Sequence, residues 1–223
     1  MRYEVETSPA YSVLKVLLEN GEGIVAEAGA MMAMKGNIEV QTKTAGGILK
    51  GLLRKLAVGE TIFLNTFTAR EGSGIIWLAP SIPGDITYIQ LKGNGLLVQD
   101  TGYLAHYGAV DYELNWRGIR GLLAEGNIVW LRLYGDGGVW VNSYGGIICK
   151  ELGVGETIIV DNNHLVAFDD TVTLNIKKFG GWKSFLFGGE GIVVELKGPG
   201  KVYMQTRILP LLAEVINRFL PKK

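Results

Sequence analysis

The sequence predicts an all-β protein of one domain, residues 1–223, that ends in a single α-helix. Three observations support this: short stretches of alternating apolar and polar residues, an excess of glycine over proline, and three related copies of one order of segments. The chain has 32 glycines and 6 prolines, and glycine supplies the left-handed backbone that short hairpins need. Its 48% hydrophobic and 20% charged residues are typical of a folded chain with a sizeable core.

The first 18 residues alternate in the manner of strands, with apolar side chains such as Tyr3 and Val5 two positions apart. Asn20-Gly21 follows, and both residues tolerate positive φ. We therefore expect strands on either side of a hairpin turn before the first repeated segment begins.

Three segments share a pattern and are expected to open three homologous units. They read GIVAEAGAM at residues 23–31, GYLAHYGAV at 102–110 and HLVAFDDTV at 164–172. This alignment places Ala26, Ala105 and Ala167 at one position, and Met31, Val110 and Val172 five residues later. Two further segments resemble each other and precede the next unit, PGDITYIQL at 83–91 and VGETIIVDN at 154–162. The recurrence predicts three pseudo-repeats of a β-meander, at about 1–95, 96–160 and 161–207.

Each unit continues with a glycine–basic–apolar segment and a pair of strands. The segments read GGILKGLLRKL (46–56), GIRGLL (118–123) and GWKSFL (181–186). The strand pairs lie at 62–79, 128–142 and 192–205, and their turns read EGSG, GDGG and GPG. The first segment alone holds three basic residues, Lys50, Arg54 and Lys55, so it is the copy in which we expect function to have been added.

Helical spacing replaces alternation after Arg207 and predicts a helix at about 209–220. Pro210 suits its first turn, where no amide donor is needed. Leu211, Val215 and Phe219 make the helix apolar on more than one side, which predicts a contact with another copy of the chain. Packing on its own domain alone stays open as the alternative.

At these residues the chain resembles a known family. GGILKGLLRKLAVGETIFLNTFTA and GGWKSFLFGGEGIVVELKGPGKVYMQT are similar to hallmark segments of the family formerly called domain of unknown function 124. Its eukaryotic members are mitochondrial biogenesis proteins of the altered-inheritance-of-mitochondria type. The resemblance extends from about residue 3 to 207.

The resemblance implies a β-sandwich of three repeats, each similar to a subunit of the tryptophan-RNA-binding attenuation protein (TRAP-like, or double-stranded β-helix-like). It also implies a homotrimer. It supplies no catalytic residues that match positions of this chain. The attenuation protein binds RNA on lysine-rich edges, and the repeats here lack a recurring basic cluster.

Composition narrows the classes of partner. Lys+Arg and Asp+Glu number 22 each, so the basic footprint of a nucleic-acid-binding protein is missing overall. Cys149 is the single cysteine, which excludes an internal disulfide and a cysteine metal site. The N-terminus lacks the pattern of a signal peptide, and no apolar run reaches about 18 residues. We expect a cytoplasmic protein, with peripheral membrane association left open.

No catalytic constellation is evident, and we expect neither a cofactor nor a metal. His106 and His164 are the two histidines, and they stand at non-equivalent repeat positions, so each is interpreted as a structural or surface residue. Cys149 is interpreted as a small buried hydrophobe.

The sequence therefore favours a non-enzymatic oligomeric scaffold or binding protein. A ring that binds a small ligand or RNA, and an unrecognised enzyme, remain alternatives. The candidate membrane or partner surface is formed by apolar and basic side chains of the glycine–basic–apolar segments. These residues are Leu49, Lys50, Leu52, Leu53, Arg54, Lys55, Arg120, Trp182, Lys183 and Phe185. Packing of the same segments within the protein is the alternative for them.

Overall fold

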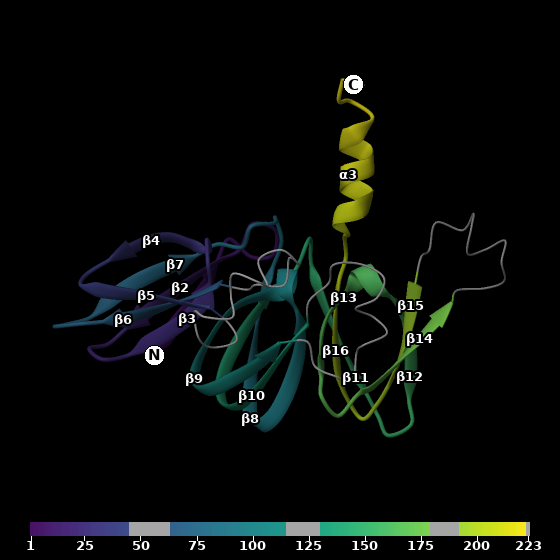
Figure 1. The fold of residues 1–223 in the computed structure, drawn as a ribbon, viewed down its shortest axis with the longest axis horizontal. Coiled ribbons are helices and arrows are strands. Elements are labelled where there is room, and N and C mark those ends of the chain that lie inside the picture. The colour runs from purple at the N-terminus through teal and green to yellow at the C-terminus, as the bar shows by residue number, and fades with distance from the viewer. Residues whose placement is uncertain (45–62, 115–129, 179–191, 222–223) are drawn as a thin grey trace.

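The computed structural model of the chain describes residues 1–44, 63–114, 130–178 and 192–221. Within these ranges the chain forms three sheets of antiparallel strands and one α-helix, which confirms the predicted all-β class and the C-terminal helix. The strands β2–β7, β8–β10 and β11–β16 follow one another along the long axis of the molecule (Figure 1), and the largest sheet includes strands from all three groups. The helix, α3 (Leu209–Asn217), extends away from them after the last strand (Figure 1).

Strand pairing divides the chain into three equivalent units, each built from three long strands. We call these the leading, flanking and central strands, in chain order. In unit one each long strand is divided in two. The leading strand is β2 (Val13–Leu18) and β3 (Gly23–Glu27), the flanking strand β4 (Met31–Lys35) and β5 (Ile38–Thr44), and the central strand β6 (Phe63–Ala69) and β7 (Gly74–Leu78).

In unit two the three strands are unbroken, whereas unit three repeats the division. Unit two consists of β8 (Ile86–Gln99), β9 (Tyr103–Leu114) and β10 (Trp130–Asn142). Unit three has β11 (Ile147–Leu152) and β12 (Thr157–Asp161) as its leading strand, β13 (Leu165–Asp169) and β14 (Thr173–Lys178) as its flanking strand, and β15 (Ile192–Lys197) and β16 (Gly200–Gln205) as its central strand.

The central strand lies between the other two in every unit. β10 pairs with β8 on one side and β9 on the other. In unit one β6 and β7 pair with the two halves of both neighbours, and β15 and β16 do the same in unit three. The three units therefore share one pairing order.

A turn in the leading strand repeats with its hydrogen bonds. The carboxylate of Glu22 accepts a bond from the amide of Glu19 at 2.9 Å, and that of Glu156 accepts one from the amide of Gly153 at 2.9 Å. In both turns the amide of the glutamate donates to the carbonyl three residues earlier. The sequences GEGIVAE at 21–27 and GETIIVD at 155–161 are thus equivalent.

This equivalence corrects the alignment made from the sequence. Ala105 and Ala167 do correspond, since they face Trp140 and Tyr203 of their central strands. Ala26 does not, because it lies on a leading strand; Ala33, which faces Trp77, holds the matching position in unit one. The alanine motif occurs on two kinds of strand because both have a small buried position. The predicted boundaries at about residues 95 and 160 fall inside β8 and β12.

Units one and three each divide their strands between the large sheet and a smaller sheet. Unit two, the second half of unit one and part of unit three form a nine-stranded sheet in the order β11-β16-β13-β8-β10-β9-β3-β6-β5. The remaining half of unit one, with the N-terminal strand β1 (Arg2–Glu6), forms a sheet in the order β1-β2-β7-β4. The remaining half of unit three forms the sheet β12-β15-β14.

The buried side chains of the described ranges form three clusters, and β10 contributes to all of them. Its Trp140 belongs to the cluster beneath β2 and β7, and its Trp130 to the cluster shared with unit three. Leu131 and Val139, which point to the opposite face because strand side chains alternate, belong to a cluster centred on unit two.

Candidate functional site

Two joints hold the units together, and both use the same strands in the same register. At the first joint β3 of unit one pairs with β9 of unit two, Val25 with His106 and Ala26 with Ala105. At the second joint β8 of unit two pairs with β13 of unit three. There Leu97 pairs with Phe168 and Val98 with Ala167. Each joint thus joins the second half of a leading strand to the first half of the next unit's flanking strand.

The matching positions can be checked against the central strands. Glu27, Gln99 and Asp161 end the three leading strands, and they face Leu64, Trp130 and Val193. The residues two positions before them, Val25, Leu97 and Ile159, are therefore equivalent. The flanking strands are aligned by Ala33, Ala105 and Ala167, so Met34, His106 and Phe168 are equivalent.

Each joint pairs the second half of a leading strand with the first half of a flanking strand. Two strands of these kinds take part in no joint among the described residues. They are β12, the leading half-strand of unit three, and β4, the flanking half-strand of unit one; each is an edge of its sheet. Positions that the joints bury are exposed here. Met34 is 45% exposed and Ile159 56%, whereas His106 and Phe168 are 3% and 0% exposed. An exposed apolar edge strand is a template for pairing with another strand.

Met31 and Met32 extend the apolar surface of β4, where every residue is exposed. The run MMAM was not recognised as an edge from the sequence, since an apolar run of that length also suits a buried strand. The missing signal was the register: only the correct alignment shows that Met34 stands where His106 and Phe168 stand.

The first joint contains a cluster of ionisable side chains. Glu27 ends β3, Asp100 begins the short 3-10 turn η1 (Asp100–Gly102), and Tyr103, His106 and Tyr112 come from β9. Burial, with the nearby charge of Asp100, raises the pKa of Glu27 from 4.5 to about 7. Burial also raises the pKa of Tyr103, with Glu27 adding to the effect. The described residues place no cationic side chain in ion-pair contact with Glu27.

His106 is held within this cluster as a neutral ring. Its Nδ1 lies 2.7 Å from the Tyr103 hydroxyl, which is also 3.3 Å from the carbonyl oxygen of Val25. Burial lowers the pKa of His106 to about 4. His106 therefore does not neutralise Glu27 at ordinary pH, and its role at the joint is structural.

The second joint is filled by apolar packing and one ion pair. Phe168 packs edge-on against Trp130 with ring centroids 5.4 Å apart. Asp170, the residue after β13, accepts two hydrogen bonds from Arg132 and one from the amide of Gly95. A Cβ on Gly95 would stand 2.1 Å from the carboxylate of Asp170, so glycine is required for this approach.

At the second joint, residues with side-chain amides occupy the two positions that Glu27 and Asp100 occupy at the first joint. Gln99 is equivalent to Glu27, and Asn162, which follows Asp161, is equivalent to Asp100. The side-chain amide of Gln99 donates to the carbonyl oxygen of Asn162 at 3.2 Å. Glu27 and Asp100 thus have uncharged counterparts of nearly the same shape.

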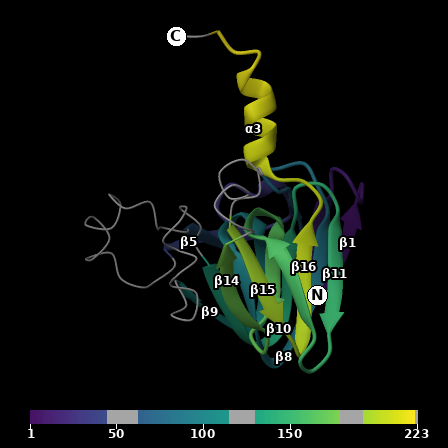
Figure 2. The same cartoon turned by 90° about the vertical axis from the view of Figure 1, so that its right-hand side faces the viewer.

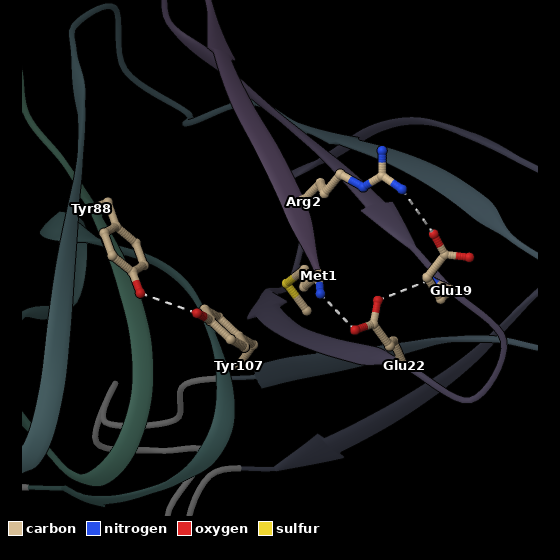
Figure 3. A network of polar contacts seen from close by, with 6 residues as sticks. All are labelled: Met1, Arg2, Glu19, Glu22, Tyr88 and Tyr107. Atoms are coloured by element: carbon tan, nitrogen blue, oxygen red, sulfur yellow. Dashed lines mark hydrogen bonds and ion pairs between the residues drawn. The ribbon is translucent and has the colours of Figure 1, made fainter.

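An aromatic cluster lies between β1 and unit two. Trp140 is surrounded by Tyr3, Tyr88 and Tyr107, with centroid distances of 5.1, 5.4 and 5.4 Å. The hydroxyls of Tyr88 and Tyr107 are 3.1 Å apart, and the terminal ammonium of Met1 is 2.6 Å from Glu22 (Figure 3). The ring contacts of Tyr3 attach β1 to unit two, and the Met1–Glu22 pair attaches it to the turn between β2 and β3. Trp140 is fully buried, so it is a core residue.

Most surface residues proposed from the sequence lie outside the described ranges. These are Leu49, Lys50, Leu52, Leu53, Arg54, Lys55, Arg120, Trp182, Lys183 and Phe185. The three proposed oligomer contacts are described and exposed, Leu211 at 55% and Val215 at 50% on α3, and Phe219 at 83% in the turn just after the helix, which ends at Asn217 and not near residue 220 as expected. α3 has no buried residue and extends away from the sheets in both views (Figure 1, Figure 2).

The remaining candidates have structural positions. His164 donates from Nδ1 to the carbonyl oxygen of Gln205 at 2.7 Å. Cys149 is exposed on β11, so its interpretation as a buried hydrophobe was wrong; β11 is an edge strand and that face of it is uncovered. In the described part of the chain no three His, Cys, Asp or Glu side chains gather as metal ligands. Nor do the described residues contain a helix long and apolar enough to cross a membrane.

Comparison with known proteins matches residues 3–207 to the mitochondrial biogenesis AIM24 family. The chain belongs to this family. An AIM24-type relative, an uncharacterized protein of Streptococcus pyogenes serotype M6, is 28% identical over 99% of this chain and 92% of its own. A crystal structure of a Streptococcus pyogenes protein superposes with a TM-score of 0.80 and 26% identity, and covers 98% of this chain and 99% of that one. The AIM24 membership confirms the resemblance seen in the sequence, whereas the likeness of each unit to the attenuation protein stays a prediction.

Proposed function

We propose that this AIM24-family chain is a non-enzymatic scaffold that assembles head-to-tail with copies of itself. The observation that carries the proposal is the identical register of the two internal joints. β12 and β4 are the strands of the same two kinds that have no such partner among the described residues. β12 of one copy pairs with β4 of the next, and the sheets β12-β15-β14 and β1-β2-β7-β4 become one. In a closed ring every β12 is paired with the β4 of a neighbouring copy, so no such edge remains free. The family resemblance implies a ring of three copies.

The register of the proposed contact follows from the internal joints. Ile159 pairs with Met34 of a second copy, as Leu97 pairs with Phe168. Val160 pairs with Ala33 of the second copy, as Val98 pairs with Ala167. Burial of the exposed methionines and of Ile159 supplies the apolar contribution, at about 25 cal/mol for each Å² of apolar surface removed from water.

The exposed side chains of α3 support a second contact between copies. Leu211 and Val215 are four residues apart and so lie on one face of α3, and the exposed Phe219 follows in the turn that ends the helix. This contact is secondary in the proposal, because the described residues contain no second helix like α3 that would define its partner.

The non-enzymatic assignment is supported by the use of both histidines in structural hydrogen bonds. Among the described residues, neither histidine belongs to a group of three His, Cys, Asp or Glu side chains that could hold a metal ion. We therefore assign the scaffold role to the edge strands β12 and β4.

Native mass spectrometry and light scattering on three variants test the proposal. Ile159→Lys and Met34→Glu should each reduce the assembly to smaller species, because each places an unpaired charge at the contact. The double variant should restore assembly, since lysine then meets glutamate of the next copy. Ile148→Lys is the matched control: Ile148 is also exposed on an edge strand but takes part in no joint, so assembly should persist.

A monomeric wild type at micromolar concentration would overturn the proposal. So would single variants that assemble normally, or a double variant no better than Ile159→Lys alone. Phe219→Asp separates the contribution of α3, which should weaken the assembly without abolishing it.

A further inference from the structure

The edge strand β4 carries three of the five methionines of the chain, Met31, Met32 and Met34. Their exposed fractions are 41%, 56% and 45%. Met1 and Met204, by contrast, are partly buried and pack against apolar clusters. A dissolved oxidant reaches a thioether sulfur where the side chain is exposed, so the sulfur atoms most accessible to it lie together on β4.

The three methionines correspond to residues that both joints bury. In each flanking strand the register shifts past one residue that has no partner on the central strand: Met32 in β4, Leu104 in β9 and Val166 in β13. This shared β-bulge aligns the methionines with Tyr103, Leu104 and His106 of the first joint and with Leu165, Val166 and Phe168 of the second. None of these six residues is more than 3% exposed.

The surface that covers β4 in the proposed assembly is apolar. There Ile159 of a second copy pairs with Met34. The second joint shows how such a contact is filled: its three corresponding residues, Leu165, Val166 and Phe168, have no hydrogen-bonding group in their side chains. An oxygen atom added to a methionine at this contact would leave water without gaining a donor from Ile159, and burying an unpaired polar group is costly.

We propose that β4 is an oxidation site that controls the head-to-tail assembly. A hydroperoxide, such as hydrogen peroxide, oxidises Met31, Met32 and Met34 on the unpaired edge, and the sulfoxides prevent β12 of the next copy from pairing with β4. The inference rests on the proposed assembly and adds a means of regulating it.

The chemistry at each methionine is the transfer of one oxygen atom. A sulfur–oxygen bond forms as the oxygen–oxygen bond of the peroxide breaks. The sulfur gives up two electrons, and the peroxide is reduced to water or to an alcohol. Methionine sulfoxide reductases reverse the change, one enzyme for each sulfoxide epimer, so the contact can form again.

Peptide mass spectrometry and light scattering of the full chain, treated with hydrogen peroxide, test the proposal. In dissociated protein we expect the three β4 methionines to oxidise about fivefold faster than Met204. In assembled protein their oxidation should become slower, because β12 covers them. Complete oxidation should raise the dissociation constant of the assembly about tenfold or more, and treatment with both reductases should reverse the rise.

Variants identify the sulfur atoms responsible, each compared with its own untreated sample. With Met31→Leu, Met32→Leu and Met34→Leu combined, peroxide should change the dissociation constant by less than about twofold, since leucine has no sulfur and nearly the same volume. Met204→Leu and Cys149→Ser are the matched controls. They remove sulfur atoms outside the contact, so both should show the full tenfold effect.

The outcomes separate this inference from the assembly on which it rests. If the β4 methionines become sulfoxides and the dissociation constant does not change, the inference is overturned and the assembly stands. A tenfold effect that persists in the triple leucine variant has the same meaning. A wild type that is monomeric before treatment would overturn both, and so would methionines that oxidise equally fast in assembled and dissociated protein.

Discussion

The two internal joints share strands, direction and register, yet different chemistry fills them. The second joint contains the Phe168–Trp130 contact and an Arg132–Asp170 ion pair whose atoms are 2.8 Å apart. The first contains Glu27 and a neutral His106 bonded to Tyr103. The main-chain pairing is therefore the part of a joint that repetition preserves. Side chains at equivalent positions have diverged, so substitutions at the two joints are expected to have different effects.

Truncation of the aromatic contact should have the largest effect. Phe168 is fully buried, and removing a buried phenylalanine side chain costs about 3–5 kcal/mol because it leaves a cavity. We expect Phe168→Ala to lower the free energy of unfolding by about 3 kcal/mol, measured by urea denaturation. His106→Ala at the equivalent position of the first joint should cost less, about 1–2 kcal/mol. Equal losses would show that the joints do not differ as described.

Removal of the charge at the first joint should stabilise the protein in a pH-dependent manner. A pKa of about 7 against 4.5 corresponds to about 3 kcal/mol above pH 7, and partial exposure of Glu27 screens some of it. We expect Glu27→Gln to raise the free energy of unfolding by about 2 kcal/mol at pH 8.5 and by little at pH 4.5. Urea titrations at both pH values provide the measurement. A variant that is less stable than the wild type at pH 8.5 would contradict a cost of burying the Glu27 carboxylate.

Loss of the ion pair at the second joint should have a smaller effect. Asp170→Asn keeps the shape but removes the charge that accepts bonds from Arg132. Because the side chain of Asp170 is 17% exposed and that of Arg132 26%, we expect a loss of about 1 kcal/mol. Thermal unfolding in low and high salt measures it: the wild type should lose part of the difference in high salt, whereas the variant should not.

The sequence was sufficient to predict the class of fold, because glycine-rich turns and period-two alternation are local signals. It also indicated repetition, since the central strands and their turns recur. It did not predict the register: Ala26 was matched with Ala105, whereas the two residues pair with each other across the first joint. Short strands with one small buried residue look alike, and only the partner strand distinguishes a leading strand from a flanking one.

The candidate site was harder to predict for the same reason. The significance of Glu27 and Asp100 depends on their correspondence with Gln99 and Asn162, and that correspondence needs the correct register. The exposure of Met31, Met32 and Met34 depends on where a sheet ends, which no local pattern specifies. The C-terminal stripe of Leu211, Val215 and Phe219 was recognisable, because helical spacing is visible within the segment itself.

The participation of β10 in all three buried clusters bears on how the chain came to be one folding unit. Trp130 and Trp140 lie near opposite ends of this strand and complete the clusters on either side. A fragment ending after unit two would leave Trp130 without Phe168 and Val202. Among the described residues, each cluster is completed by side chains of a neighbouring unit. We therefore expect the chain to unfold in a single cooperative transition, in which no unit separates from the other two.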